Sequence, residues 1–210
     1  MVIIIIIIIF LSILQITGEW YVVEIVKHKV DSVHPTVERM VLETCPSVRI
    51  RFSTRTSLRL LWNEKVGDLE YSFVIPDFYG TPGLWESRGL QNGTLLSRKY
   101  VQFSGTVQVM KAVASHMVLT FCSKTPDNQM YSILLSRKRD LPEDDSTGVR
   151  NLLSRRGLTI ATVQQTCRNG GTRKESSSVI YFYTVRGDDK RIATYYSVGC
   201  EILRYTIILL

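Results

Sequence analysis

The feature that most constrains the fold is a series of short apolar segments between residues 19 and 137, separated by turn residues at regular intervals. In several of them apolar and polar side chains alternate: Leu69, Tyr71 and Phe73 lie opposite Glu70 and Ser72. Such alternation is typical of antiparallel strands that bury one face and expose the other. It predicts strands at residues 19–28, 47–53, 57–63, 68–75, 99–103, 106–112, 116–122 and 129–137, and a less regular short strand at 84–87.

One helix is predicted after the last strand. Pro142 suits a first helical position, and the acidic residues that follow it suit the first turn. Val149, Leu152 and Leu153 recur at helical spacing, and Gly157 is suited to end the helix. Sequential antiparallel strands can close into a barrel, which removes exposed sheet edges. The predicted fold is therefore all-β: an eight-stranded antiparallel up-and-down barrel with one C-terminal α-helix packed outside.

Residues 1–17 form a separate apolar segment. A run of isoleucines occupies residues 3–9, and no Lys or Arg precedes it. We interpret residues 1–17 as a signal peptide or short apolar leader, with the bond between Thr17 and Gly18 as the best place for cleavage. An uncleaved signal anchor is the alternative. The sequon at Asn92, Gly93 and Thr94 predicts glycosylation of Asn92 and agrees with secretion.

Composition and motifs argue against most other classes of protein. The 210 residues are 45% apolar and 21% charged, which is typical of a globular protein. The net charge of +7 is modest for a nucleic-acid binder, and aromatic residues do not alternate with the basic clusters. No nucleophile elbow, zinc-protease motif, P-loop or dinucleotide fingerprint is present, so we predict that the protein is not an enzyme. Scattered histidines and the lack of a C-x-x-C spacing predict no metal site, and no cofactor is expected.

The tail, residues 168–210, lies beyond the predicted barrel. Apolar segments at residues 179–185 and 191–198 flank a polar stretch at 186–190, so a β-hairpin is one arrangement that fits. The sequence thus divides into a leader (1–17), a barrel with its helix (18–167) and a tail of undetermined structure.

Several short motifs follow one another in a recognisable order. The first predicted strand opens with Gly-Glu-Trp-Tyr at residues 18–21. The last one ends at Arg137, shortly before a Leu-Pro pair and the helix, and Gln-Gln-Thr-Cys follows at residues 164–167. Residues 82–85 (PGLW) and 45–46 (CP) complete the pattern. Together these motifs resemble the lipocalin family, in particular the branch of apolipoprotein D, Lazarillo and the insect bilin-binding proteins. The resemblance covers residues 18–167.

The resemblance implies structural roles for several residues. It places Trp20 and Arg137 together at the barrel floor, and it implies a disulfide between Cys45 and Cys167. Cys122 and Cys200 are then left, either paired with each other or free. One departure is that Lys-Ala occupies residues 111–112, where the family has an acidic turn residue.

The resemblance also implies a function: a secreted, extracellular carrier that binds a small hydrophobic ligand in its barrel, of the fatty acid, sterol, retinoid or tetrapyrrole class. The alternative is a secreted module with a filled barrel, which binds a cell-surface receptor or another secreted protein through its outer surface. Nucleic acid is not an expected partner, and a membrane is one only if the leader stays uncleaved. Side chains on the predicted inner face are the candidate barrel wall: Leu60, Trp62, Tyr71, Phe73, Tyr131, Ile133 and Leu135.

Overall fold

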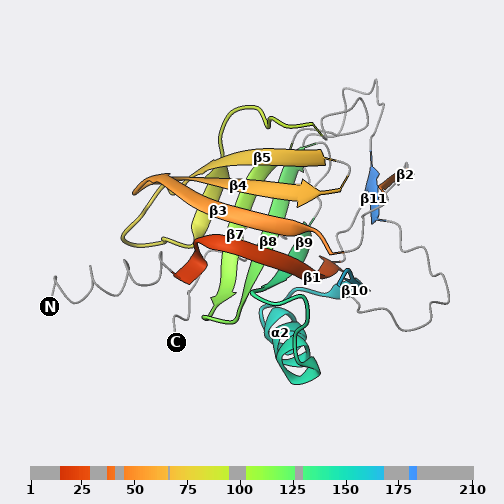
Figure 1. Ribbon diagram of the computed structural model, residues 1–210. Coiled ribbons are helices and arrows are strands. Elements are labelled where there is room, and N and C mark those ends of the chain that lie inside the picture. The colour runs from red at the N-terminus through yellow and green to blue at the C-terminus, as the bar shows by residue number, and fades with distance from the viewer. Residues whose placement is uncertain are drawn as a thin grey trace, which may run out of the picture.

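The computed structural model shows a closed antiparallel barrel, as predicted. It describes residues 15–28, 37–40, 45–65, 67–94, 103–125, 130–167 and 180–183. Each barrel strand pairs with its sequence neighbour in the barrel, and the first pairs with the last, which closes the sheet (Figure 1). The eight barrel strands are β1 (Gly18–His28), β3 (Ser47–Thr54), β4 (Ser57–Glu64), β5 (Gly67–Val74), β6 (Leu84–Ser87), β7 (Ser104–Ala112), β8 (His116–Thr125) and β9 (Met130–Ser136).

Three further strands lie outside the closed barrel. β10 (Ile160–Gln165) pairs with the C-terminal half of β1, whereas β3 pairs with its N-terminal end. β1 therefore has β3, β9 and β10 as neighbours at different points along its length. β2 (Val37–Met40) and β11 (Ile180–Tyr183) form a separate two-stranded antiparallel sheet. This pairing joins a segment of the predicted tail to a segment between the first two barrel strands.

The short segment at β6 completes the barrel. Residues 99–102 of the strand predicted at 99–103 lie outside the described residues, and Phe103 directly precedes β7. In the tail, β11 pairs with β2, while the other half of the predicted hairpin, residues 191–198, also lies outside the described residues.

Strand alternation sorts the apolar side chains into two cores. Along β8, Met117, Leu119 and Phe121 point into the barrel, while Val118 and Cys122 point outward beneath the helix. The interior core is one continuous cluster, which runs from Trp20 near the start of β1 to Phe121 on β8. The outer core fills the space between the barrel wall and the helix. The barrel interior is therefore separate from the helix contact.

The predicted helix is present as α2 (Glu143–Arg155), packed against the outside of the barrel (Figure 1). Acidic side chains occupy its first turn, where they interact favourably with the helix dipole. Val149 and Leu153 are fully buried against the wall. Among the described residues, no helix is long and apolar enough to cross a membrane.

Candidate ligand-binding site

One end of the barrel is closed by Trp20 and Arg137. The Arg137 guanidinium carbon lies 3.5 Å from the centroid of the Trp20 ring, a cation–π contact. The same guanidinium donates hydrogen bonds of 2.7 Å to the carbonyl oxygens of Gln15, Thr17 and Glu19. The charge is thus held between an aromatic face and three carbonyls, and partial burial lowers the Arg137 pKa.

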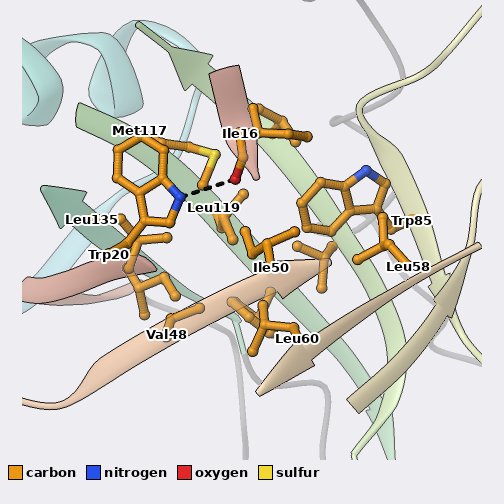
Figure 2. Close-up of a cluster of buried hydrophobic side chains, with 14 of the residues drawn as sticks. Ile16, Trp20, Val48, Ile50, Leu58, Leu60, Trp85, Met117, Leu119 and Leu135 are labelled. Atoms are coloured by element: carbon orange, nitrogen blue, oxygen red, sulfur yellow. Dashed lines mark hydrogen bonds between the residues drawn. The ribbon is translucent and has the colours of Figure 1, made fainter. Parts of the chain in front are cut away.

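The segment before the first barrel strand is part of this floor. Ile16 is buried in the interior core, and its carbonyl accepts a 2.9 Å hydrogen bond from the Trp20 indole (Figure 2). Gly18 has φ +92°, and a Cβ there would lie 3.2 Å from Nη1 of Arg137, so a larger residue would be strained. Residues 15–17 are therefore part of the floor, and cleavage between Thr17 and Gly18 would remove their contacts.

The half of the interior next to the floor is tightly packed. Figure 2 shows Trp20, Trp85, Ile50 and neighbouring buried side chains gathered between the strands. Among the predicted wall residues, those with at most 1% of their surface exposed are Leu60, Phe73, Ile133 and Leu135. These four belong to the buried interior core, and their role as ligand contacts stays a prediction.

The opposite half, which we call the mouth, is lined by aromatic side chains that point inward and yet remain half-buried. The other predicted wall residues lie here: Trp62 near the end of β4, Tyr71 on β5 and Tyr131 on β9. Phe103, just before β7, joins them. Phe52 and Phe78 are also half-buried, but they lie toward the floor. Partial exposure of inward-facing rings is what a ligand-accessible surface requires.

The mouth rings contact one another across the barrel. Tyr131 and Phe121 stack with centroids 4.9 Å apart and planes 4° apart. Tyr71 and Phe73 stack at 6.1 Å and 12°. Phe103 contacts both pairs edge-on. The sequence analysis missed Phe103 because its partners come from other strands, and it missed Phe121, although alternation with Leu119 was a usable signal.

A few polar groups accompany these rings. The Trp62 indole donates a 2.6 Å hydrogen bond to Oε1 of Glu64, whose side chain is buried. Burial raises the pKa of Tyr131 well above its ordinary value, and the nearby Tyr71 adds to this shift. The Tyr131 phenol is therefore neutral at physiological pH and can donate or accept a hydrogen bond. An apolar surface with convergent hydroxyl and carboxylate groups can bind and orient a small molecule.

The outer wall holds two buried polar clusters that do not face the interior. Glu24 forms a 2.8 Å ion pair with Arg150 of α2. Nε2 of His28 lies 2.8 Å from the Ser132 hydroxyl, which lies 2.7 Å from that of Thr120. Burial lowers the pKa of His28 to about 4, against a smaller opposing effect from the backbone of Thr159. Within the described ranges, no group of three or more acidic, His or Cys side chains could hold a metal ion.

The remaining predicted residues lie outside the barrel interior. Cys45 and Cys167 form a disulfide, which joins the start of β3 to the end of β10. Cys122 is also disulfide-bonded, and since Cys200 lies outside the described residues the Cys122–Cys200 pairing stays a prediction. Asn92 is exposed beside β5, with its backbone bonded to that of Glu70.

The closed barrel, the Trp–Arg floor and the external helix define a lipocalin-like architecture. Solved structures with a similar fold include two proteins named for amine binding. One is a biogenic amine-binding protein (selenomethionine derivative), with a TM-score of 0.52, 15% identity and coverage of 71% of this chain and 78% of the other. The second is the tryptamine complex of the amine-binding protein of Rhodnius prolixus, with a TM-score of 0.52, 16% identity and coverage of 71% and 77%. No family model matches the sequence, and the comparison with curated proteins gives no match.

Proposed function

We propose that the protein binds and carries a small, mainly apolar ligand in the mouth of its barrel. The observation that carries this proposal is the group of inward-facing yet half-buried rings: Trp62, Tyr71, Phe103 and Tyr131. The packed floor half limits the site to the mouth, so the ligand is small or only partly enclosed. Among the ligand classes predicted from the sequence, the aromatic lining suits a ligand with flat rings better than a flexible fatty acid.

An amine is a further ligand class to test. The two similar structures are named for amine ligands. In this chain the Glu64 carboxylate accepts the Trp62 hydrogen bond within the mouth, and carboxylate and indole are groups that recognise an ammonium ion. We also infer extracellular localisation, which the Cys45–Cys167 disulfide supports. Placement in the apolipoprotein D and Lazarillo branch rests on the sequence motifs.

The test is a titration of the full chain with anilinonaphthalene sulfonate, a fluorescent probe of apolar sites, followed by competition with a retinoid, a fatty acid and tryptamine. The proposal predicts saturable one-to-one binding that Tyr131→Ala weakens about tenfold, because a contact ring is lost. Ser72→Ala, which changes an outward side chain next to Tyr71 on β5, is the matched control and leaves the affinity unchanged. A flat titration of folded protein would exclude the carrier function.

A second function is supported by a different surface. Arg51 of β3 lies directly across from Arg59 of β4, and Arg59 pairs in turn with Ser72, whose carbonyl accepts a hydrogen bond from the Arg88 backbone. Like charges in directly opposite positions are unfavourable. The Glu70 carboxylate, 3.3 Å from Nη1 of Arg59, offsets part of this positive charge. An acidic protein partner would fit this outer face. Replacing Arg51, Arg59 and Arg88 with Gln would abolish such binding while leaving the probe titration unchanged.

A further inference from the structure

Phe103 occupies an unusual place in the mouth of the barrel. Its ring lies between the two stacked pairs and meets three of their rings edge-on. Its centroid is 5.7 Å from that of Phe121, 6.2 Å from that of Tyr71 and 6.4 Å from that of Phe73, with interplanar angles of 73°, 77° and 65°. Edge-to-face contacts at these distances are favourable for aromatic groups. A single side chain therefore contacts both stacked pairs, one on β5 and the other on β8 and β9.

The backbone of Phe103 is hydrogen-bonded to the side chain of Gln91. Phe103 precedes the first residue of β7. Its backbone N–H donates a 2.8 Å hydrogen bond to Oε1 of Gln91, and its carbonyl accepts a 2.6 Å bond from Nε2 of the same residue. Gln91 is buried and fixes both backbone groups of Phe103. Release of these two bonds would let the ring move out while the ladder of β7 stays intact.

We propose that the Phe103 ring occupies the slot in which a ligand ring binds, and that a planar aromatic ligand of one or two fused rings enters by displacing it. This inference rests on the proposed binding function and names the ligand class for that site. The slot has stacked rings on both sides, so it suits a flat ring and gives fewer contacts to a flexible chain. A neutral Tyr131 phenol donates or accepts a hydrogen bond, so it suits a polar substituent on such a ring.

The first test compares wild type with Phe103→Ala and Phe103→Leu in the full chain, by calorimetric titration with indole and with dodecanoate. Removal of the competing ring is expected to tighten indole binding about tenfold in Phe103→Ala, with a smaller gain in Phe103→Leu. Dodecanoate binding should change less than indole binding does. Phe103→Leu retains most of the apolar volume, so it keeps the test valid if the alanine variant fails to fold.

A second test separates displacement of the ring from simple creation of space. Gln91→Ala releases the Phe103 backbone without removing any ring, so it leaves the slot its original size. Stopped-flow binding of anilinonaphthalene sulfonate should then be severalfold faster to Gln91→Ala than to wild type. Gln108→Ala is the matched control, since Gln108 is half-buried on β7 and its amide donates a hydrogen bond to the Val109 carbonyl.

The possible outcomes distinguish the two proposals. If wild type binds the probes but the Phe103 and Gln91 variants bind with unchanged affinity and rate, the displacement of Phe103 is wrong and the carrier function stands. If Phe103→Ala binds indole more weakly than wild type, Phe103 is a ligand contact and the slot assignment is overturned. If neither wild type nor any folded variant binds a probe, both proposals fail.

Discussion

In the floor of the barrel, Arg137 makes several contacts that depend on the shape of its guanidinium group. It combines a cation–π contact with three hydrogen bonds to carbonyls, which uses the planar fork of a guanidinium. A lysine would keep the charge but lose most of this geometry. We expect Arg137→Lys to lower the free energy of unfolding by about 2 kcal/mol in urea titrations. Arg139→Lys, at a residue 5.2 Å from the Tyr21 ring, is the control and should cost much less. Equal losses in the two variants would contradict the floor assignment.

His28 makes the stability of the protein depend on pH. Its pKa falls from an ordinary 6.5 to about 4 because it is buried, so the unfolded chain binds the proton more readily than the folded protein does. The stability that the neutral ring provides is complete above pH 6.5 and is lost as the pH falls from about 6.5 to 4. At pH 4.5 the loss amounts to roughly 2–3 kcal/mol relative to pH 7. Denaturant unfolding measured over this range checks the prediction.

The control for this prediction is His28→Leu, which cannot titrate. Burial also lowers the pKa of His116 and raises that of Glu24, so the variant retains some pH dependence of its own. The difference between the two proteins isolates His28. Parallel curves for wild type and His28→Leu would show that His28 titrates normally in the folded state.

The sequence identified some of these side chains and not others, for physical reasons. Trp20 and Arg137 belong to a motif whose spacing is visible along the chain. Glu24 and His28 gave no such signal, because a β-bulge between Val22 and Glu24 shifts the alternation of β1 and places both side chains outward, beneath other elements. Phe103 was missed as a site residue because its environment is made of rings from other strands.

The helix α2 is joined to the barrel by the ion pair of Arg150 with Glu24, whose side chains are buried to different extents. The Glu24 side chain is 2% exposed, whereas that of Arg150 is 23% exposed and also contacts Glu143. Removal of Arg150 leaves a buried carboxylate without its charge partner. We expect Arg150→Met to cost about 3 kcal/mol of unfolding free energy, and a second change, Glu24→Gln, to restore much of it. Additive losses in this double-mutant cycle would rule out the coupling.

An element could be predicted well when the residues that determine it lie close together in the sequence. The helix was predicted well because its first turn, apolar stripe and terminal Gly157 lie close together in sequence. The long barrel strands followed from alternation. β6 occupies the residues 84–87 at which a short strand was predicted, although it is only four residues long. β10 is exposed on most of its side chains, so it lacks an apolar pattern, and its position depends on pairing with β1, which no local window contains.

For the barrel as a unit, the Cys45–Cys167 disulfide closes a loop that contains most of the barrel. The two cysteines are 122 residues apart in sequence. A cross-link of this span restricts the unfolded chain strongly, so replacing both cysteines with serine should cost about 3–5 kcal/mol. Urea unfolding of the double variant provides the measurement, with probe binding as a check that the barrel remains folded. An unchanged unfolding midpoint would mean that the link adds little to a barrel already closed by β1 and β9.

Ligand binding should also stabilise the barrel as a unit, because a ligand that bridges the mouth contacts β5, β8 and β9 only when they are assembled. A ligand present at a hundredfold excess over its Kd is expected to add about 2.7 kcal/mol to the free energy of unfolding, if it does not bind the unfolded chain. Thermal unfolding with increasing indole would show this as a midpoint that rises with concentration. Tyr131→Ala should need about ten times more indole for the same rise, whereas the outward Arg51, Arg59 and Arg88 triple variant should follow wild type. The reverse pattern, with the arginine variant losing the effect, would place the binding surface on the outside of the barrel.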